Sequence, residues 1–326
     1  MKRRELIALL GGAAAAWPLA ASAQEAGRIY RLGLMLPFPR DARESVGIVD
    51  ALTDELRRNG FVERQNLAIE YRAWAPQMDL VSDYAADLAA LDVFAVGGPV
   101  AVRAVQKATK IMPILAITDD MISEGVVKSM ARPDGNTTGV SILATELNGK
   151  RQKILIEGVP GVRRIAALAD TATSPPAQLE ALQQEAKARG IELSIQRVDK
   201  GDEIPAALAA AKASGAGALN VLASPMLHSN HQLIMERVAV LRLPAIFQWP
   251  ELAEEGRLVA YGPRFTQIVR DLFARQLVQL FRGVKVADIP VEQPSKFELA
   301  INLKTANALG VTVPAALVAR ADKVIE

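Results

Sequence analysis

The chain of 326 residues contains no cysteine. Disulfides and a thiol nucleophile are therefore excluded, and no cysteine follows the N-terminal segment to carry a lipid anchor. The formal net charge is only +2, and no run of Lys or Arg occurs after the first few residues. Nucleic-acid binding needs a basic stripe, so no nucleic acid is expected as a partner. Half of the residues are apolar, and the core alone must hold the fold together.

Motifs of the commoner enzyme classes are also missing. The sequence has no G-x-x-x-x-G-K-[ST] loop, no G-x-S-x-G elbow and no S-x-x-K pair. The tripeptide Gly97-Gly98-Pro99 lacks the G-x-G-x-x-G spacing of a dinucleotide site. Both histidines, His228 and His231, lie three residues apart without a well-placed third metal ligand, which favours two polar residues in an exposed helical turn. We therefore expect no metal, no cofactor and no enzyme activity.

The first 23 residues have the pattern of a signal peptide. A basic start is followed by an apolar run and by Ala21-Ser22-Ala23, a small-x-small cleavage site. The apolar run is short and contains Pro18, which argues against a transmembrane helix. The adjacent Arg3 and Arg4 resemble a twin-arginine export signal, and an ordinary secretory signal is the alternative. Either route predicts an exported, periplasmic protein without a lipid anchor.

From Arg31 onward, strand-like and helix-like segments alternate along the chain. The strand-like segments are 31–36, 67–74, 91–96, 112–117, 164–170, 191–198, 217–223 and 243–248. The helix-like segments between the earlier ones include 44–60, 79–90, 99–109 and 176–190, and 265–283 forms one long amphipathic pattern. This alternation predicts α/β architecture with parallel sheets covered on both faces.

The two halves of the chain follow the same plan. Gly60 ends one predicted helix and Gly190 ends another. Pro113 and Pro244 each open a predicted strand, and their separation along the chain is similar to that between the two glycines. We therefore predict two similar doubly wound lobes. Their expected bounds are 28–141 with about 263–290 for the first lobe, 142–262 for the second, and 291–326 for a crossover and tail of undecided lobe.

Polar and aromatic residues follow the predicted strands. They are Pro37 and Phe38, Gly97 to Pro99, Thr118 to Asp120, Thr171 to Ser174, Ser224 and Pro225, and Phe247 to Trp249. In parallel sheets these positions share the edge at which open α/β folds bind ligands. Predicted helix N-termini behind Pro99 and Asp120 would suit an anionic group, and the aromatic rings would supply apolar walls. Core packing is the alternative for each ring. We favour Trp249 for the wall, because it follows a strand end and precedes Pro250.

Four longer stretches resemble one known family. They are LGLMLPF, LRRNGFVERQNLAIEYRAW, TDDMISEGVVKSMARPDGNTTGVS and the C-terminal PVEQPSKFELAINLKTANALGVTVPAALVARADKVIE. On these residues the chain resembles the ABC transporter substrate-binding proteins that include tryptophan- and tyrosine-binding members. The resemblance implies a type I periplasmic binding fold, in which three crossovers join two lobes that close on a small molecule. It also implies a monomer that delivers its ligand to an inner-membrane ABC permease with its ATPase.

The resemblance also implies which residues contact the ligand and which form the hinge. The implied ligand contacts are Phe38, Gly98, Pro99, Thr118, Asp119, Ser174, Ser224 and Trp249. The strand beginning TTGVS would leave the first lobe and GRLVAYG would return to it, which places hinge residues at Thr138 and Gly139 and at Tyr261 and Gly262.

The sequence departs from the family pattern at two positions. Relatives often have Asp-Pro where this chain has Asp119-Asp120, and amino-acid binders tend to carry an acidic residue near Ser224. With serine there, the ammonium group of an amino-acid ligand loses an obvious partner. The expected ligand is a small organic solute, either an amino acid or an aromatic or other carboxylate. The alternatives are a sensory module for a membrane receptor and an exported hydrolase or lyase with Asp119 or Asp120 as base.

Overall fold

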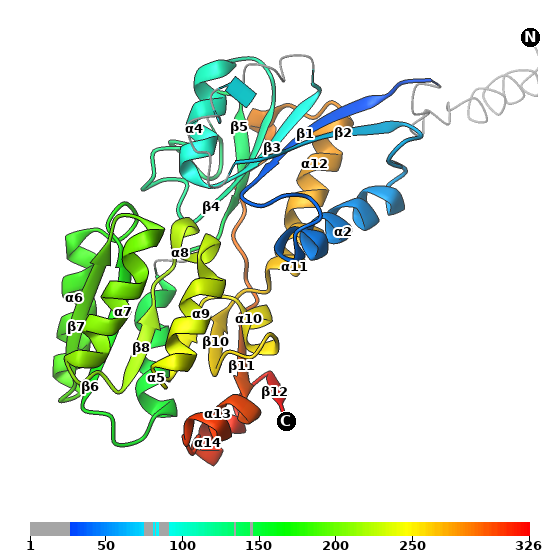
Figure 1. The fold of residues 1–326 in the computed structure, drawn as a ribbon. Helices are drawn as coiled ribbons and strands as arrows, with labels where there is room; N and C mark the ends of the chain where they lie inside the picture. The colour runs from blue at the N-terminus through cyan, green and yellow to red at the C-terminus, as the bar shows by residue number, and fades with distance from the viewer. Residues whose placement is uncertain (1–26, 75–80, 82, 85–90, 134, 144–145) are drawn as a thin grey trace, which may run out of the picture.

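The computed structural model describes residues 27–74, 81, 83–84, 91–133, 135–143 and 146–326. These residues form two α/β lobes, one above the other, which are linked by thin connections (Figure 1). The predicted signal peptide and most of the predicted helix 79–90 lie outside the described residues.

The first lobe is built on a five-stranded parallel sheet with the order β2-β1-β3-β4-β5. The strands are β1 (Tyr30–Leu36), β2 (Leu67–Ala73), β3 (Val93–Gly97), β4 (Ile114–Thr118) and β5 (Thr137–Ser141). The helices are α2 (Arg43–Arg58), α4 (Pro99–Ala108), α11 (Phe265–Ile268) and α12 (Ala274–Phe281). Strands β3 and β4 are buried along their whole length, as expected for a sheet covered on both faces.

The second lobe contains a seven-stranded sheet with the order β12-β11-β10-β9-β8-β6-β7. The strands are β6 (Arg164–Asp170), β7 (Glu192–Val198), β8 (Ala218–Val221), β9 (Ala245–Phe247), β10 (Val259–Gly262), β11 (Glu298–Asn302) and β12 (Lys323–Ile325). The helices are α5 (Leu147–Gly158), α6 (Pro176–Ala188), α7 (Ile204–Ala213), α8 (Pro225–Ser229), α9 (His231–Val240), α10 (Pro250–Glu254), α13 (Leu303–Leu309) and α14 (Ala315–Val318). Only the pair β10–β11 in this sheet is antiparallel within the described ranges.

The two sheets confirm the predicted duplication. The order β7-β6-β8-β9-β10 of the second lobe repeats the order β2-β1-β3-β4-β5 of the first. Gly60 and Gly190 follow equivalent helices with φ angles of 89° and 69°, a left-handed conformation that glycine adopts without a steric penalty. The fold is therefore two similar doubly wound lobes, with β11 and β12 added to the second.

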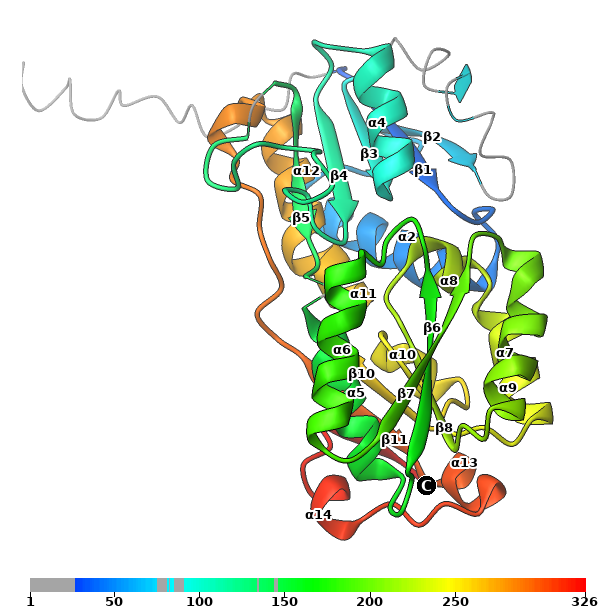
Figure 2. The same cartoon turned by 90° about the vertical axis from the view of Figure 1, so that its left-hand side faces the viewer.

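Three crossovers connect the lobes. The chain passes from β5 to α5, returns from β10 to α11, and crosses again between the short 3-10 helix η4 (Val286–Asp288) and β11. Figure 2 shows the third crossover as the orange segment that descends beside the sheets. Near its start this segment runs along β5, where the Glu292 N–H donates to the Gly139 carbonyl at 3.0 Å and the Ser141 N–H donates to the Glu292 carbonyl at 2.9 Å.

The C-terminal tail belongs to the second sheet. Strand β11 pairs with β10, and β12 pairs with β11. The Asp322 carboxylate accepts a hydrogen bond from the Leu299 N–H at 2.8 Å, which fixes the start of β11 against the turn that precedes β12. The sequence left the lobe of this tail undecided, because its pairing depends on contacts far apart along the chain.

Two local predictions differ from the structure. The long helix predicted for 265–283 consists of α11 and α12 joined by a π-helical segment, η3 (Val269–Phe273), and it ends at Phe281. No helix follows Asp120 in the described part of the chain, so that prediction is wrong. A turn stands there instead, because the Asp120 carboxylate accepts hydrogen bonds from the N–H groups of Ile122 and Ser123 at 3.0 and 3.1 Å.

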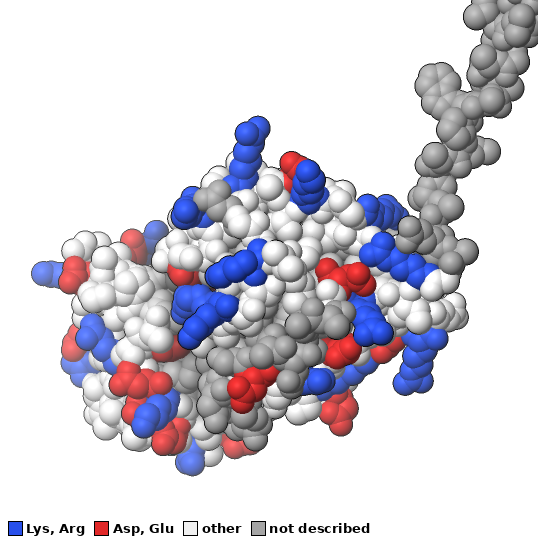
Figure 3. All heavy atoms as spheres, turned by 90° about the horizontal axis from the view of Figure 1, so that it is seen from above, with Lys and Arg blue, Asp and Glu red and all other residues white. Residues whose placement is uncertain are grey.

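The surface of the first lobe carries both signs of charge. Figure 3, which views the molecule from above, shows small separate groups of basic and acidic side chains with uncharged surface between them. No helix of the described ranges is long and apolar enough to cross a membrane.

Candidate functional site

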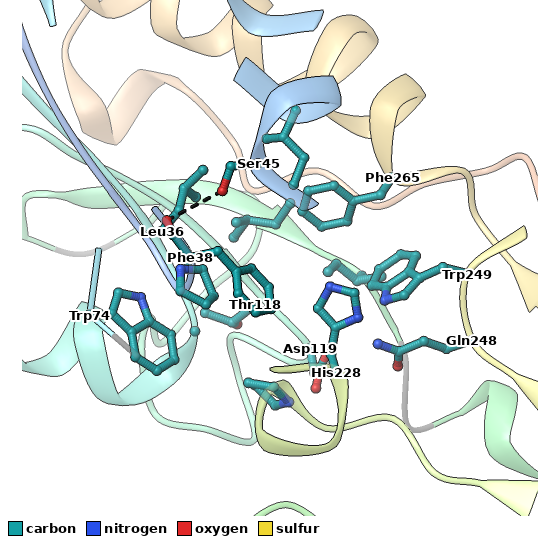
Figure 4. Close-up of a pocket in the computed structure, with 17 residues that line it drawn as sticks. Leu36, Phe38, Ser45, Trp74, Thr118, Asp119, His228, Gln248, Trp249 and Phe265 are labelled. Atoms are coloured by element: carbon teal, nitrogen blue, oxygen red, sulfur yellow. Dashed lines mark hydrogen bonds between the residues drawn. The ribbon is translucent and has the colours of Figure 1, made fainter. Parts of the chain in front are cut away.

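A cavity of about 90 Å³ lies between the two lobes. Its lining comes from the ends of β1, β2, β3, β4 and β5 and the residues that follow them, from the loop after β9, and from α2, α8 and α11 (Figure 4). The lining residues are Leu36, Pro37, Phe38, Ser45, Ile48, Trp74, Gly97, Gly98, Ile117, Thr118, Asp119, Ile142, Pro225, His228, Gln248, Trp249 and Phe265. The carboxyl edges of both sheets therefore face one cavity, as the doubled architecture predicts.

Four aromatic side chains form the apolar walls of this cavity: Phe38, Trp74, Trp249 and Phe265. Trp249 of the second lobe packs edge-on against Phe265 of the first, with ring centroids 5.0 Å apart and an interplanar angle of 86°. Phe38 of the first lobe lies edge-on to His228 of the second, at 6.1 Å. Ring contacts thus bridge the lobes directly at the cavity.

The loop that carries Phe38 is held by hydrogen bonds to its backbone. The Tyr71 hydroxyl donates to the Phe38 carbonyl at 2.6 Å, and Ser45 lies 3.1 Å from the same hydroxyl. Burial raises the pKa of Tyr71, with the hydrogen bond to Ser45 acting in the opposite direction, so the phenol remains a proton donor at neutral pH. The backbone at Phe38 is therefore fixed by Tyr71, which does not line the cavity, and by Ser45, which does.

The N-terminus of α4 lies at the floor of the cavity. Gly97 and Gly98 line the cavity immediately before α4 begins, and Gly98 has a φ of 86°. A Cβ at Gly98 would lie 3.5 Å from the Trp74 ring, an ordinary van der Waals contact, so glycine is favoured here by the positive φ and not by lack of space. The exposed N–H groups and the dipole of a helix start favour an anionic ligand group here.

Asp119 supplies a buried carboxylate to the cavity. Its side chain is 7% exposed, and Oδ2 has no hydrogen-bond partner among the described residues. Burial raises the pKa of Asp119 to about 6; the positive charge of Arg151 lowers it, while Asp170 and Asp120 raise it further. At neutral pH Asp119 is therefore mainly ionised, and its charge lacks a direct hydrogen-bond donor on Oδ2.

The two histidines are not in an exposed turn, and that prediction is wrong. His231 is 3% exposed, and His228 lines the cavity with its Nδ1 buried. The rings stack 5.4 Å apart, and His231 Nδ1 lies 2.7 Å from the His228 carbonyl oxygen. Burial, helped by His231 and Arg257, lowers the pKa of His228 to about 3, so its imidazole is neutral at physiological pH.

Five of the eight predicted ligand residues line the cavity: Phe38, Gly98, Thr118, Asp119 and Trp249. Pro99, Ser174 and Ser224 do not line it. The Ser224 hydroxyl donates to Asp170 Oδ2 at 2.5 Å and accepts from the Leu227 N–H at 3.2 Å, which caps α8. Phe247, expected as a wall, is buried in the core below.

Sequence reasoning missed His228, Trp74 and Phe265 as members of the site, whereas Gln248 fell within the predicted strand-end range Phe247 to Trp249. Gln248 directly precedes Trp249 in the loop after β9 and was named only as part of a strand end. Trp74 directly follows β2, the position that marked the other candidates, and the same signal would have included it. Phe265 begins α11, after the chain has crossed to the second lobe and back, and no local sequence pattern marks it as a site residue.

The predicted hinge residues lie in the strands that lead into the crossovers. Thr138 donates from its hydroxyl to the Ile289 carbonyl at 2.7 Å, and Gly139 accepts from Glu292 of the third crossover. In β10, the Tyr261 carbonyl accepts a 2.8 Å hydrogen bond from the buried Arg151 guanidinium. Within the described ranges, no cluster of three or more His, Cys, Asp or Glu side chains is arranged to hold a metal.

This fold, with a cavity enclosed between two lobes, is that of a two-lobed solute-binding protein. Residues 39–325 match the family described as ABC transporter substrate binding protein, and the chain belongs to that family. It is similar to a tyrosine-binding protein of Clostridioides difficile, with 26% identity over 287 residues that cover 84% of this chain and 79% of the relative. The family and this relative are substrate-binding proteins, not enzymes.

Solved structures share the fold. A conserved domain protein from Vibrio cholerae superposes with a TM-score of 0.81 at 21% identity, covering 91% of this chain and 100% of the other. An ABC domain from Streptococcus pneumonia, in complex with L-Trp, gives a TM-score of 0.79 at 22% identity with the same coverage. A ligand-free, open substrate-binding protein from Clostridium difficile gives 0.65 at 19% identity, covering 91% of this chain and 99% of that one.

Proposed function

We propose that the protein is the periplasmic solute-binding component of an ABC importer and that it binds a small aromatic solute between its lobes. The observation that carries the proposal is the interlobe cavity walled by Phe38, Trp74, Trp249 and Phe265, with few polar groups among them. Pockets of this kind bind apolar ligands and orient them by a small number of polar contacts.

The relatives support an aromatic amino acid as the first ligand class to test. One is a tyrosine-binding protein, and a structural neighbour holds L-Trp. An amino acid would place its ring between the aromatic walls and its carboxylate near the N-terminus of α4, at Gly98. The signal-like N-terminal segment supports export, by the twin-arginine or the general secretory route, and the family supports delivery of the ligand to an inner-membrane permease.

The function is tested with a panel of ligands on the purified mature protein. L-tyrosine, L-tryptophan, L-phenylalanine and their deaminated acids are compared with aliphatic amino acids in thermal unfolding. A ligand at 100 times its Kd stabilises the native state by about 2.7 kcal/mol, which is a readily measured shift in Tm. Absence of a shift with every aromatic compound, together with turnover of a test ester or glycoside, would contradict the proposal.

Import itself needs a cellular measurement. Deletion of the gene should abolish uptake of the radiolabelled ligand identified in the panel, and the wild-type gene should restore it. A strain that keeps full uptake but loses a transcriptional response to the ligand would instead support the sensory alternative.

A further inference from the structure

Three polar side chains meet at one end of the cavity: Asp119, His228 and Gln248, which we call the polar corner. Asp119 follows β4 in the first lobe, whereas His228 on α8 and Gln248 after β9 belong to the second. All three line the same cavity, and Figure 4 shows their polar ends directed toward a common space beside Trp249.

Each member of the polar corner buries one polar atom that has no hydrogen-bond partner among the described residues. The atoms are Asp119 Oδ2, His228 Nδ1 and Gln248 Oε1. Buried polar groups in folded proteins are nearly always paired, because an unpaired group loses its hydration without compensation. The same lining also buries the indole Nε1 donors of Trp74 and Trp249 without a partner among the described residues, so the cavity presents donors to a ligand as well as the acceptors of the polar corner.

All three atoms can accept a hydrogen bond. The Asp119 and Gln248 oxygens are acceptors by their chemistry, and a neutral imidazole has one acceptor nitrogen. His228 is kept neutral by its burial and by the neighbouring His231 and Arg257. A ligand group that pairs with all three atoms must therefore offer several donors within a small volume, and a primary ammonium group offers three.

The charge of the cavity favours the same kind of partner. No Lys or Arg is among the described residues that line it, and the lining carries one carboxylate, Asp119. Arg151 acts on Asp119 at longer range, and its guanidinium is engaged by the Tyr261 carbonyl and by Asn148. A cationic ligand group would pair with the buried carboxylate and form charge-assisted hydrogen bonds.

We propose that the polar corner binds the primary ammonium group of the ligand, with Asp119 as the counter-ion and His228 and Gln248 as neutral acceptors. This inference rests on the proposed function and defines the ligand class as an aromatic molecule with a protonated amine. It also provides the ammonium partner that Ser224 cannot supply, since the Ser224 hydroxyl is bound to Asp170. Because the corner draws on both lobes, the full set of acceptors assembles only when the lobes are together.

Matched ligand pairs test the proposal. L-tyrosine is compared with 3-(4-hydroxyphenyl)propionate, and L-tryptophan with indole-3-propionate, since each acid keeps the ring and carboxylate and lacks only the amine. Affinities are measured by calorimetry on the mature protein at pH 7.5. We expect removal of the amine to weaken binding at least about 100-fold, because a site built for a polar group discriminates strongly against an analogue that lacks it.

The variant Asp119→Asn removes the counter-ion, and Asp120→Asn is its control. Asp120 lies next in the chain, carries the same charge and is outside the lining, where it caps a turn that asparagine can also cap. D119N should lose about 100-fold for the amino acid and leave the deaminated acid unchanged, while D120N should behave like the wild type.

Two outcomes overturn the inference: a deaminated acid that binds the wild type as tightly as its amino acid, or an amino-acid affinity unchanged in D119N. Either result leaves the proposed function standing, because an aromatic ligand still binds. If no aromatic compound binds the wild type, the proposed function fails, and the inference fails with it. Ligand-free thermal unfolding of each variant shows that it is folded before its affinity is compared.

Discussion

The buried carboxylate of Asp119 should make the ligand-free protein less stable as the pH rises. The pKa of Asp119 is raised to about 6 in the folded state, so the native protein retains a proton there that the unfolded chain releases near pH 4. The stability contributed by this proton is present below about pH 4 and is lost as the pH rises through about 6. The charges of Asp170 and Asp120 raise the pKa of Asp119 further, and the charge of Arg151 lowers it.

Asp119→Asn should therefore stabilise the ligand-free protein at high pH. A shift from an ordinary aspartate pKa to about 6 corresponds to about 3 kcal/mol. The free energy of unfolding of D119N, relative to wild type, should rise by up to about that amount between pH 3.5 and pH 8, as measured by urea unfolding at each pH. A constant difference across this range would show that the carboxylate is well solvated. If D119N is more stable than the wild type but binds the ligand poorly, then Asp119 lowers the stability of the protein in order to bind the ligand.

Trp249 should matter more for binding than for folding. Trp249 is 5% exposed, but its indole borders the cavity and its buried Nε1 has no hydrogen-bond partner among the described residues, so a ligand in the cavity would contact the ring. Trp249→Ala should weaken aromatic ligand binding at least about 100-fold, or about 2.7 kcal/mol, and lower the free energy of unfolding by less than that.

Phe94→Ala is the control for Trp249→Ala. Phe94 is fully buried on β3 away from the cavity, and its truncation should cost about 3–5 kcal/mol of stability with little change in affinity. Binding is followed by tryptophan fluorescence for this control, because Trp74 and Trp249 are the two tryptophans after the signal-like segment and both line the cavity. Equal losses of affinity and stability in Trp249→Ala would show that Trp249 acts through core packing and not through contact with the ligand.

At the scale of elements, the hinge strands leave no space for larger residues at their glycines. A Cβ at Gly262 would lie 2.0 Å from the Gln248 carbonyl oxygen, and one at Gly139 would lie 1.8 Å from the Ala116 carbonyl oxygen. Both contacts are with backbone, which cannot move without disturbing neighbouring strands β9 and β4. Gly262→Ala should therefore destabilise the protein by at least about 1–3 kcal/mol in chemical unfolding.

Gly149→Ala is the matched control for Gly262→Ala. Gly149 lies in α5, has no atom within 4 Å of the position of an added Cβ, and has no positive φ, so alanine should stabilise the helix by up to about 1 kcal/mol. If Gly262→Ala unfolds like the wild type, the β9–β10 contact must be more adjustable than its geometry indicates.

The elements also show how far the sequence alone could lead. Helix α2 was predicted from the spacing of Val49, Leu52 and Leu56, and all three are buried. The strand-end rule placed Asp119 and Trp249 correctly at the cavity, since the edge of a parallel sheet follows from its topology. The same rule failed for the side chain of Ser224, which sits at the right edge but turns to cap α8 and to bind Asp170. Side-chain direction at a loop depends on such local competition, which periodicity does not reveal.

Contacts between the lobes could not be predicted from the sequence, for a different reason. His228 stands on a short helix of the second lobe and lies edge-on to Phe38 of the first at the cavity. These residues are far apart in the chain, and neither has a neighbour that marks the pairing. A histidine taken locally is a polar residue of an exposed turn; in the folded protein His228 lines the cavity between the lobes, and burial together with His231 and Arg257 lowers its pKa.

At the scale of the whole molecule, ligand binding should bring the lobes together and hold them. The cavity is lined from both lobes, so a ligand gains its full set of contacts only in the closed arrangement, and it shifts the population toward that arrangement. The absence of cysteine allows two labels to be introduced without background. Lys107→Cys on α4 and Lys187→Cys on α6 place exposed labels on the first and second lobes.

The distance between these labels is measured by pulsed electron paramagnetic resonance, with and without a saturating aromatic ligand from the panel. The ligand-free sample should give the broader distribution, because the contacts that a ligand makes with both lobes are absent, and the ligand should narrow it to a single short distance. A second pair, Lys187→Cys with Lys212→Cys on α7, lies within the second lobe and should give one distance in both samples. Identical distributions for the interlobe pair at saturation would mean that the ligand enters a preformed closed site, and that the hinge strands do not take part in binding.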